Sequence, residues 1–525
     1  MSSQPLKRAL LSVSDKSGLL ELAQVLLKYK VELISSGGTG EFLKTHGLPF
    51  TPVETITGNP EVFGGRMKTI SFAIGSSLLY RREHPQDLQE ASELGIKPID
   101  LVVCHLYPFE KIASLNGDEE TLIENIDIGG PTMLRAAAKN FAHVAVCPDP
   151  SFYPELIQEI EQGAGHTQLE FRKKFSLATF RHCALYDALI TRVLEERWET
   201  DDFSLMVSSA KGTSLRYGEN PQQKAFCAPT SLSTSSLARS TPLQGKELSY
   251  NNLWDADSSW RALKDLHHSR QTDKYPSAVC IVKHANPCGL SLAATQAEAL
   301  HLAWACDPVS SFGSIVSFNQ EVTAEAAEIL SQSFVELVLA PSFSKESLQI
   351  FQKKKNLRLM IGDLAQVKNE WTLRSIDGGV LLQTEDGTPL EELTWVSQKK
   401  SDISNALVRF GLVAVKHLRS NGIALVQESS KGLQLVGSGM GNPNRLVSIS
   451  QAYEKAREIG ISDFSDVALF SDAFFPFEDN ILKAHDYGIQ TFIQPGGSIK
   501  DNEVIMCVDR LNLKMATTQT RHFRH

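Results

Sequence analysis

The beginning of the chain constrains the fold most, because it alternates between two kinds of apolar pattern. Residues 8–13 predict a strand, residues 19–30 carry Leu and Ala at helical spacing, and residues 31–35 predict a second strand. This order is a βαβ unit, in which the two strands run parallel. The polar loops that follow both strands are then expected at the carboxyl end of the sheet, where open α/β sheets bind ligands.

The length of 525 residues requires more than one hydrophobic core. Strands and helices alternate throughout, so the fold class is α/β. We expect a doubly wound parallel-sheet domain over residues 1–148, a mainly helical connection over 149–204 and a larger α/β region over 205–525. Further strands are expected at 100–104, 143–147, 278–282, 422–427, 433–436, 466–470 and 490–494.

The composition argues against several classes of protein. With 42% hydrophobic residues and no apolar run approaching the roughly 18 residues of a membrane span, we expect a soluble chain without a membrane partner. The eight cysteines include no Cys-x-x-Cys pair and mostly lie in apolar runs, which indicates reduced thiols and a cytoplasmic location. The net charge of −9 argues against a nucleic-acid partner but allows a local basic site for a phosphate.

Two loops of the amino-terminal region combine groups that bind phosphate. The run Ser36-Gly37-Gly38-Thr39 offers backbone N–H groups, hydroxyls and the beginning of a helix, and Lys16 on the neighbouring loop adds a countercharge. A glycine-rich turn alone is more often only a turn. In the second run, Gly64-Gly65-Arg66-Met67-Lys68-Thr69, Arg66 and Lys68 are two positions apart and point to the same side of an extended segment.

Two further polar clusters lie in the same region. The run His105-Leu106-Tyr107-Pro108-Phe109 follows a predicted strand. The run Asp127-Ile128-Gly129-Gly130-Pro131-Thr132 opens a predicted helix that continues to Lys139, with Pro131 suited to the first helical position. A stacked tyrosine, a helix cap and a surface lysine would explain each cluster separately. Four such clusters in one small domain favour a binding or catalytic site.

The pair Lys283-His284 is the main candidate for chemistry in the second half of the chain. It ends the apolar run 278–282 and precedes the turn-rich run Ala285-Asn286-Pro287-Cys288-Gly289. This pattern predicts a buried strand that delivers a base and a cation into a loop. A solvated loop end is the commoner explanation of such a pair when it occurs alone.

Taken in order, these motifs closely resemble the family of bifunctional AICAR transformylase/IMP cyclohydrolase enzymes of purine biosynthesis. The resemblance covers essentially the whole chain, and the joint pattern is specific although each motif alone is not. Its motifs are Val13-Ser14-Asp15-Lys16, Ser36-Gly37-Gly38-Thr39, Gly64-Gly65-Arg66, Lys68-Thr69, Leu106-Tyr107-Pro108-Phe109, Ile126-Asp127-Ile128-Gly129-Gly130, Leu215-Arg216-Tyr217, Lys283-His284, Ser311-Phe312-Gly313, Ser420-Asn421, Ser471-Asp472-Ala473-Phe474 and Arg521-His522-Phe523-Arg524-His525.

The resemblance implies two activities. The carboxy-terminal region, built of cytidine-deaminase-like subdomains, would transfer a formyl group from the co-substrate 10-formyltetrahydrofolate to AICAR, giving FAICAR. The amino-terminal domain, methylglyoxal-synthase-like in fold, would close FAICAR to IMP with loss of water. The family also implies a homodimer. A transformylase with a weakened or non-catalytic nucleotide-binding domain is the alternative.

The resemblance also assigns residues to the two reactions. Formyl transfer needs a base, an oxyanion stabiliser and a group that holds the formyl oxygen. For these three roles the resemblance implies His284, Lys283 and Asn421, in that order. The implied substrate contacts are Arg216, Tyr217, Asn252, Phe312, Arg445, Phe474, Asp479 and Arg521. For ring closure, the implied catalytic groups are Lys68, Tyr107, Asp127 and Lys139, and the implied binding groups are Ser14, Lys16, Ser36, Gly37, Gly38, Thr39, Arg66 and Thr69.

The chain departs from the family pattern beside Lys68, where the usual Leu-His-Pro is Ile70-Ser71-Phe72. The usual asparagine two positions before Tyr107 is His105, and the arginine-bearing loop is rewritten over residues 437–445. Ser71 and Phe72 would change the polarity and the volume beside a reacting lysine. We therefore expect ring closure to persist at a reduced rate, because a misplacement of about 1 Å can cost on the order of 10²-fold.

Three other classes of protein fit the sequence less well. A zinc deaminase needs His-x-Glu and Pro-Cys-x-x-Cys, but His284-Ala285-Asn286 and Pro287-Cys288-Gly289-Leu290-Ser291 lack the glutamate and the second cysteine, so no catalytic metal is expected. A dinucleotide-binding motif at Gly437-Ser438-Gly439 lacks its third glycine. A non-enzymatic nucleotide-binding regulator would have lost its acid and base groups, which this chain keeps.

Overall fold

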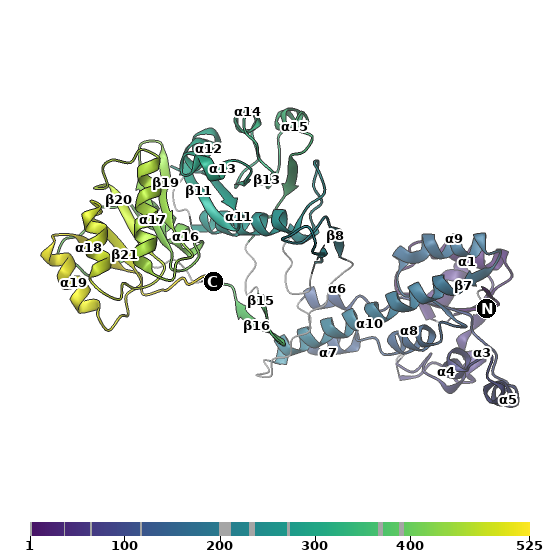
Figure 1. The fold of residues 1–525 in the computed structure, drawn as a ribbon. Coiled ribbons are helices and arrows are strands. Elements are labelled where there is room, and N and C mark those ends of the chain that lie inside the picture. The colour runs from purple at the N-terminus through teal and green to yellow at the C-terminus, as the bar shows by residue number, and fades with distance from the viewer. Residues whose placement is uncertain are drawn as a thin grey trace. The chain divides into compact units, whose positions relative to one another are not determined.

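The computed structural model divides the chain into two compact units, Met1–Ser208 and Ser209–His525 (Figure 1). Helices α9 (Tyr153–Gln162) and α10 (Leu169–Trp198) pack against α1 and α8 of the first unit. The segment expected to be a connection is thus largely part of the amino-terminal unit. The structure describes residues 3–35, 37–63, 66–115, 118–198, 212–229, 237–269, 274–365, 371–387 and 393–525.

The first unit is built around a five-stranded parallel sheet in the order β4-β3-β2-β5-β6. Its strands are nearly continuous runs of buried residues, because helices cover both faces of a doubly wound sheet. The strands are β2 (Arg8–Ser12), β3 (Glu32–Ser35), β4 (Thr51–Pro52), β5 (Leu101–Cys104) and β6 (Ala145–Cys147), with β1 (Ser3–Pro5) and β7 (His166–Gln168) paired separately. The predicted parallel α/β domain is confirmed.

The chain order reverses between β2 and β5, which are neighbours in the sheet. Such a reversal leaves a crevice beyond the carboxyl ends of the strands, since the connections leave in opposite directions. The helices of this unit are α1 (Leu19–Lys28), α2 (Gly37–Thr45), α3 (Val53–Thr57), α4 (Phe72–Leu79), α5 (Pro85–Glu93), α6 (Phe109–Ser114), α7 (Glu119–Glu124), α8 (Gly129–Lys139), α9 and α10. Helix α8 begins at Gly129, so Pro131 is its third residue rather than its first.

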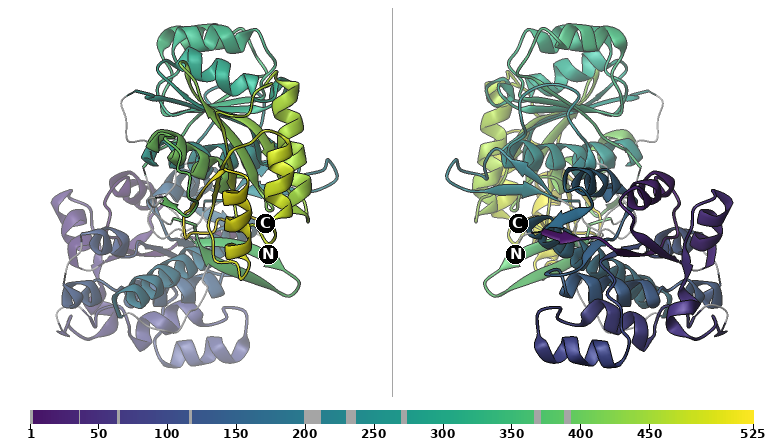
Figure 2. Two further views of the ribbon diagram at one scale, coloured as in Figure 1. Left: turned by 90° about the vertical axis from the view of Figure 1, so that its left-hand side faces the viewer. Right: turned by 90° about the vertical axis from the view of Figure 1, so that its right-hand side faces the viewer.

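The second unit is built around an eleven-stranded sheet, which Figure 2 shows in two turned views. The sheet order is β14-β13-β12-β10-β11-β19-β18-β20-β21-β22-β17. The strands are β10 (Ser277–Lys283), β11 (Asn286–Ala293), β12 (Ile315–Phe318), β13 (Leu337–Ala340), β14 (Arg358–Ile361), β17 (Thr394–Trp395), β18 (Ile423–Glu428), β19 (Gly432–Gly439), β20 (Val467–Ser471), β21 (Thr491–Gln494) and β22 (Lys514–Thr517).

The two halves of this sheet repeat one pattern of a helix, a hairpin, a second helix and three strands. In each hairpin the register shifts at the same place, after Ile281 in β10 and after Leu425 in β18. Gly289 and Gly437 lie opposite these residues, and a Cβ at either would meet a backbone carbonyl of the next helix. The helices are α11 (Tyr250–Ser269), α12 (Gln296–Ala305), α13 (Pro308–Ser311), α14 (Ala324–Ser331) and α15 (Lys345–Phe351), then α16 (Asn405–Lys416), α17 (Arg445–Glu458), α18 (Asp479–Asp486) and α19 (Asp501–Arg510).

Alternating strand residues form cores on the two faces of the sheet. Cys280 and Val282 belong to a cluster on one face that spans both halves, together with residues of α11 and α16. Val279 and Ile281 point to the other face and belong to a separate cluster with α12 and α14. Every strand near the centre is therefore buried on both faces, and chemistry is confined to the edges where strands end.

The turn-rich segment after Lys283 was predicted to be a loop, and this is wrong. The turn is only the two residues His284 and Ala285, and β11 begins at Asn286 and pairs antiparallel with β10. Pro287 is tolerated because it lies at the bulge, before the residues of β11 that pair with β19. Two small hairpins complete the described part of this unit, β8 (Thr213–Leu215) with β9 (Ala225–Cys227) and β15 (Trp371–Ile376) with β16 (Gly379–Thr384). Within the described residues, no helix has the length and hydropathy needed to cross a membrane.

Candidate active sites

A cavity of about 1040 Å³ lies at the reversal point of the first unit. Residues that follow β2, β3 and β5 line it together with the beginning of α8, as the strand-end argument predicts. Nine residues predicted for ring closure lie in its wall: Ser14, Lys16, Gly38, Thr39, Arg66, Lys68, Thr69, Tyr107 and Asp127. Ser36 lies outside the described residues, as do Gly64 and Gly65 of the second glycine-rich run.

One end of the cavity carries a network of donors around Thr39. The Thr39 hydroxyl accepts a hydrogen bond from the Val13 backbone N–H at 3.0 Å, and Lys16 Nζ lies 3.3 Å from the same oxygen. Lys16 Nζ also donates to the Val13 carbonyl. Burial and then the neighbouring charge of Lys68 lower the pKa of Lys16. Two ammonium groups beside a helix beginning suit a phosphate.

Lys68 reaches from the opposite wall toward this end of the cavity. Its Nζ lies 3.3 Å from Glu61 Oε2 and directly against Gly37, where any Cβ would collide with it. Gly37 has a φ of 50°, so this position favours glycine for its backbone as well as for space. Arg66 instead forms an exposed ion pair with Glu124. The structure thus places Lys68 next to the glycine-rich loop, although 31 positions separate Lys68 from Gly37 in the sequence.

Asp127 lies at the beginning of α8, with its carboxylate held inside the cavity wall. Asp127 Oδ1 accepts a hydrogen bond of 2.7 Å from the Gly130 N–H, and the Asp127 N–H donates to the Tyr186 hydroxyl at 2.8 Å. Burial raises the pKa of Asp127 above its ordinary value. Burial and then the neighbouring Asp127 also raise the pKa of Tyr107. A carboxylate with a raised pKa is a stronger base than an ordinary aspartate.

Lys139 is not brought into this cluster. It is the last residue of α8, is exposed, and is not among the described residues that line the cavity. Ten residue steps of about 1.5 Å place it roughly 15 Å along the helix from Gly129. The sequence correctly predicted the helix, but the helix carries Lys139 away from the end that bears Asp127.

His105 is a buried part of the cavity wall, with 6% of its surface exposed. Its Nε2 lies 2.9 Å from the Tyr153 hydroxyl, and burial lowers its pKa to about 4, so the imidazole is neutral at pH 7. Tyr153 lies in α9, 48 positions away, and no local pattern in the sequence predicts this pair. His105, which replaces the asparagine usual in the family, is therefore held by a hydrogen bond to Tyr153.

Two of the three residues beside Lys68 that depart from the family, Ser71 and Phe72, are not among the described residues that line the cavity. Ser71 caps α4, where its hydroxyl accepts a hydrogen bond from the Ile74 N–H at 3.2 Å. Phe72 is 69% exposed. Of Ile70, Ser71 and Phe72, only Ile70 is among the described residues that line the cavity. The change in polarity and volume that we expected beside the reacting lysine is therefore not found.

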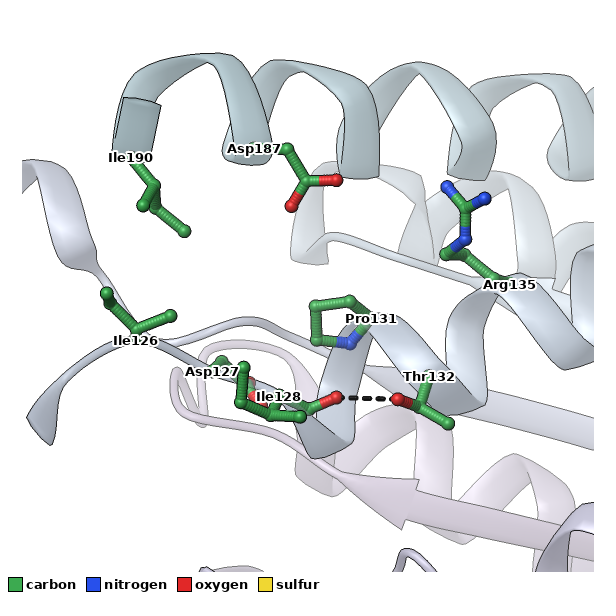
Figure 3. A pocket seen from close by; sticks show the side chains of 8 residues that line it. All are labelled: Ile126, Asp127, Ile128, Pro131, Thr132, Arg135, Asp187 and Ile190. Carbon is green, nitrogen blue, oxygen red and sulfur yellow. Dashed lines mark hydrogen bonds between the residues drawn. The ribbon is translucent and has the colours of Figure 1, made fainter. Parts of the chain in front are cut away.

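A second cavity, of about 400 Å³, lies on the other side of Asp127. Figure 3 shows Arg135 of α8 and Asp187 of α10 reaching into the space above Pro131. The Thr132 hydroxyl closes the first turn of α8 by donating to the Ile128 carbonyl at 2.8 Å. This cavity shares Ile126, Asp127 and Ile128 with the larger one but contains neither of the lysines.

In the second unit, strand directions bring six of the predicted transformylase residues to one edge of the sheet: Lys283, His284, Phe312, Asn421, Arg445 and Phe474. Because β10, β11, β19 and β18 are successively antiparallel, the end of β10 and the beginning of β18 lie at the same edge. The end of β19, the beginning of β12 and the end of β20 also lie there. Three strand spacings place Asn421, before β18, about 14 Å along this edge from Lys283.

Lys283 and His284 stand at the centre of this edge. Lys283 Nζ donates a hydrogen bond of 2.9 Å to the Phe312 carbonyl, which fixes the ammonium beside the beginning of β12. The His284 ring is exposed, and the Phe312 ring is 59% exposed. The Lys283 ammonium is thus bound to the backbone of a residue with an accessible aromatic ring, and an exposed imidazole follows it in the chain.

Asn421, Arg445 and Phe474 form a second cluster at this edge. Arg445 Nη2 donates to the Asn421 side-chain oxygen at 2.7 Å and to Asp472 Oδ1 at 2.9 Å, and Nη1 donates to the Phe474 carbonyl at 3.1 Å. Asn421 Nδ2 donates to the Asn442 carbonyl at 2.9 Å. The rewritten loop therefore still brings an arginine to Asn421. Asp472 was not predicted as a site residue, although it lies within a motif that carried the resemblance.

The other predicted substrate residues have local partners. Asn252 is buried in α11, where Nδ2 donates to Glu336 Oε2 at 2.8 Å. The Arg216 guanidinium packs 4.6 Å from the centre of the Tyr217 ring and donates to its hydroxyl at 2.7 Å. The Arg521 guanidinium packs 4.4 Å from the Phe523 ring. Asp479 begins α18, is exposed, and accepts a hydrogen bond of 2.7 Å from Asn480 Nδ2.

Comparison with known proteins matches the chain to two family models. The model of the AICARFT/IMPCHase bienzyme family matches residues 137–455, and that of the MGS-like domain matches residues 18–132. A bifunctional purine biosynthesis protein PurH from Persephonella marina is 40% identical over 527 residues, covering 99% of this chain and 100% of the relative. Its counterpart from Bacillus cereus (strain ATCC 10987 / NRS 248) is 41% identical over 530 residues, with the same coverage. A solved structure titled "Crystal structure of ForH" is 33% identical and covers 36% of this chain and 96% of that one, with a TM-score of 0.32. The chain belongs to the AICARFT/IMPCHase bienzyme family of bifunctional purine biosynthesis.

Proposed function

We propose that the second unit transfers the formyl group of 10-formyltetrahydrofolate to the amino group of AICAR, releasing tetrahydrofolate and FAICAR. The amine is a weak nucleophile because its lone pair is delocalised toward the carboxamide. His284 takes the amine proton as the new N–C bond forms, and Lys283 stabilises the oxyanion of the tetrahedral intermediate. When the intermediate collapses, the bond from the formyl carbon to N10 of the folate breaks, and N10 takes up that proton as tetrahydrofolate leaves. Asn421, oriented by Arg445, holds the formyl oxygen or the substrate amide.

The same edge offers groups for the flat and the charged parts of both substrates. Aromatic rings stack on purine precursors and pterins, and guanidinium groups bind phosphate or a carboxamide edge. In this proposal Tyr217, Phe312 and Phe474 stack, Arg216 and Arg521 bind the ribotide, Asn252 holds its amide, and Asp479 contacts the folate. Lys283, Phe312, Asn421, Arg445 and Phe474 have the best structural support, because hydrogen bonds join them into two clusters at one edge.

For the first unit we propose ring closure of FAICAR to IMP. The carboxamide nitrogen attacks the formyl carbon and gives one proton to Asp127. The formamide nitrogen then loses its proton as the ring C=N bond forms, the C–O bond breaks, and the former formyl oxygen leaves with two protons as water. Lys68 and Tyr107 stabilise and protonate that oxygen. Lys139 has no part in this step, because it lies at the far end of α8. The proposed phosphate contacts are Ser14, Lys16, Gly37, Gly38, Thr39, Arg66 and Thr69, with Ser36 added from its place in the same loop.

One observation carries the bifunctional proposal. A single cavity of the first unit brings Lys16, Lys68, Tyr107 and Asp127 together at the reversal point of the sheet. A nucleotide-binding module without catalysis would need only the phosphate end of this cavity. The raised pKa of the Asp127 carboxyl is a property that ring closure uses and binding does not.

The test is to incubate the full chain with AICAR and 10-formyltetrahydrofolate and to follow tetrahydrofolate and IMP separately. We expect both products, and IMP again when FAICAR alone is supplied. Tetrahydrofolate without IMP, together with no conversion of added FAICAR, would show a transformylase only. No release of tetrahydrofolate above the rate without enzyme would contradict formyl transfer.

We further propose that the enzyme works in the cytoplasm, as a homodimer and without a catalytic metal. Its cysteines are all free in the structure, and seven of the eight are buried, which suits a reducing compartment. Among the described residues, no three His, Cys, Asp or Glu side chains are grouped to hold a metal ion. Sedimentation of the purified chain, with and without AICAR, tests the dimer.

A further inference from the structure

The backbone that presents Lys283 and His284 has an unusual conformation. His284 has a φ of 55° and Ala285 a φ of 58°, so both turn residues lie in the left-handed region. Two-residue hairpin turns of this kind are normally made by Asn and Gly, because a Cβ disfavours this region. Histidine and alanine therefore need outside support to hold the turn.

Asp255 of α11 supplies that support. Its Oδ2 accepts a hydrogen bond of 3.1 Å from the His284 N–H, and its Oδ1 accepts one of 2.6 Å from the Ala285 N–H. One carboxylate thus satisfies both amides of the turn. On the other side of the turn, the Asn286 side chain donates to the His284 carbonyl at 2.8 Å.

This arrangement requires a carboxylate in particular. Each of its two oxygens faces a backbone N–H, so both must accept hydrogen bonds. An asparagine side chain has one oxygen and one NH₂ group, and the NH₂ would face an N–H donor. Burial raises the pKa of Asp255, and the two N–H bonds offset only part of that rise.

We infer that Asp255 is a positioning residue that clamps the His284-Ala285 turn and so aims the His284 imidazole at the substrate amine. The inference deepens the proposed formyl transfer and rests on it. Helix α11 packs on β10 and is part of the rigid core, so the clamp ties the orientation of the base to the sheet. Formyl transfer is sensitive to that orientation because the reacting amine must lie within hydrogen-bond reach of the base.

The main test compares Asp255→Asn with Asp257→Asn. Asp257 lies two positions further along α11, where it pairs with Arg261 at 2.8 Å. For Asp255→Asn we expect kcat of formyl transfer to fall roughly 10- to 100-fold, with KM for AICAR within about twofold. Ring closure of added FAICAR by the same protein should be unchanged. Adding Ala285→Gly should recover part of the kcat, because glycine adopts the left-handed conformation at no steric cost.

A second measurement does not depend on activity. Hydrogen exchange of the peptide that contains residues 283–286 should be at least about tenfold faster in Asp255→Asn than in Asp257→Asn, because the two amides lose their acceptor. If the wild type releases no tetrahydrofolate while exchange still accelerates, the proposed function fails and the clamp stands.

Three results would overturn the inference: equal kcat in Asp255→Asn and Asp257→Asn, equal loss of both half-reactions in Asp255→Asn, or unchanged exchange. Asp255→Glu is a second variant that should fold even if Asp255→Asn does not, because it keeps the charge. It still disturbs the clamp, because it moves the carboxylate oxygens by the length of one methylene group. We expect it to lower kcat of formyl transfer by about tenfold with a normal melting temperature. A folded Asp255→Glu with wild-type kcat would also contradict the clamp.

Discussion

Arg445 Nη2 donates a hydrogen bond of 2.7 Å to the side-chain oxygen of Asn421, which fixes the direction of that amide. The same guanidinium group is paired with Asp472 and is only 9% exposed. In the proposed formyl transfer, we therefore expect Arg445 to act mainly by orienting Asn421, rather than as a free cation for a phosphate. The Asn421 Nδ2 group has its own acceptor in the Asn442 carbonyl, so both ends of the amide are oriented.

His284→Ala tests the proposed base. The variant should lower kcat of formyl transfer by roughly 10²–10⁴-fold, because the amine proton loses its acceptor. Ring closure in the other unit should be unaffected. His301→Ala, at an exposed position of α12, is the matched control and should behave as wild type. A loss of AICAR affinity with near-normal kcat would make His284 a binding residue instead.

Asp127→Asn tests the base for ring closure. We expect kcat for conversion of FAICAR to IMP to fall by at least about 10²-fold, while formyl transfer continues. The raised pKa of Asp127 also predicts a pH profile. A base must be deprotonated, so the rate should fall on the acid side at a pH above the ordinary aspartate pKa. Asp118→Asn, at the cap of α7, is the control and should behave as wild type. If the rate of ring closure falls only at the pKa of an ordinary aspartate, the assignment of Asp127 as the base is contradicted.

Phe72→Ala tests whether the departure from the family weakens ring closure. Because Phe72 is exposed and Ser71 is occupied in capping α4, we expect less than about a twofold change in the rate from FAICAR. Ser71→Ala should lower stability by about 1 kcal/mol through loss of the cap, again without a specific effect on ring closure. Faster ring closure in Phe72→Ala would show that this side chain hinders the site.

Chelation tests the absence of a catalytic metal. With formyl transfer assigned to His284, Lys283 and Asn421, dialysis against a strong chelator should leave the rate unchanged. Elemental analysis of the active protein provides the control. Stoichiometric zinc, with activity that is lost on its removal and restored on its return, would refute the prediction.

His417 predicts how the stability of the second unit depends on pH. His417 Nε2 lies 2.6 Å from Asp265 Oδ2, and Nδ1 lies 3.1 Å from Arg524 Nη1, which fits a neutral ring that donates to the carboxylate and accepts from the guanidinium. Burial lowers the pKa of His417 to about 4, from 6.5. The unfolded chain therefore binds more protons between these values, so stability is complete above pH 6.5 and falls as the pH drops toward 4.

Between pH 6.5 and pH 4, we expect His417 to lower the free energy of unfolding by at most about 3 kcal/mol. Thermal melts of the full chain at pH 7 and pH 5 measure it. His417→Asn should be less stable at pH 7 and should show a shallower dependence on pH, while Lys416, paired with Asp265 at 2.9 Å, is left in place. An unchanged slope in His417→Asn would assign the pH dependence to other groups, such as His105 in the first unit.

The sequence predicted elements well where local pattern decides the structure. The run 278–282 is strand β10, and the predicted βαβ unit at the beginning of the chain is present. The prediction was wrong for Asn286-Pro287-Cys288-Gly289, whose residue types favour turns. In the structure this run belongs to β11 and pairs with β10, the strand directly before it in the chain. Long-range contacts were also beyond local pattern, as in the hydrogen bond of His105 to Tyr153.

The site residues divide in the same way. Lys16 and Lys68 could be proposed from their glycine-rich neighbours, and both line the cavity. Lys139 could have been rejected from the sequence, since a helix that starts near Asp127 carries a residue ten positions later well away from it. Asp255 carries no motif of its own, and only the hydrogen bonds to a distant turn reveal its role.

The antiparallel junction of β11 with β19 has a consequence for the symmetry of the larger unit. The two halves of the sheet are related by an approximate twofold axis through the sheet, so each strand position at one edge has an equivalent position at the opposite edge. The register shifts after Ile281 in β10 and after Leu425 in β18, so the positions equivalent to Lys283 and His284 are Gln427 and Glu428. Glu428 is engaged by the Tyr275 hydroxyl at 3.0 Å and by the Ser404 hydroxyl. The repeated pattern thus gives the sheet two equivalent places, of which one carries an ammonium group and an imidazole, while at the other Glu428 links the two halves of the sheet through Tyr275 and Ser404.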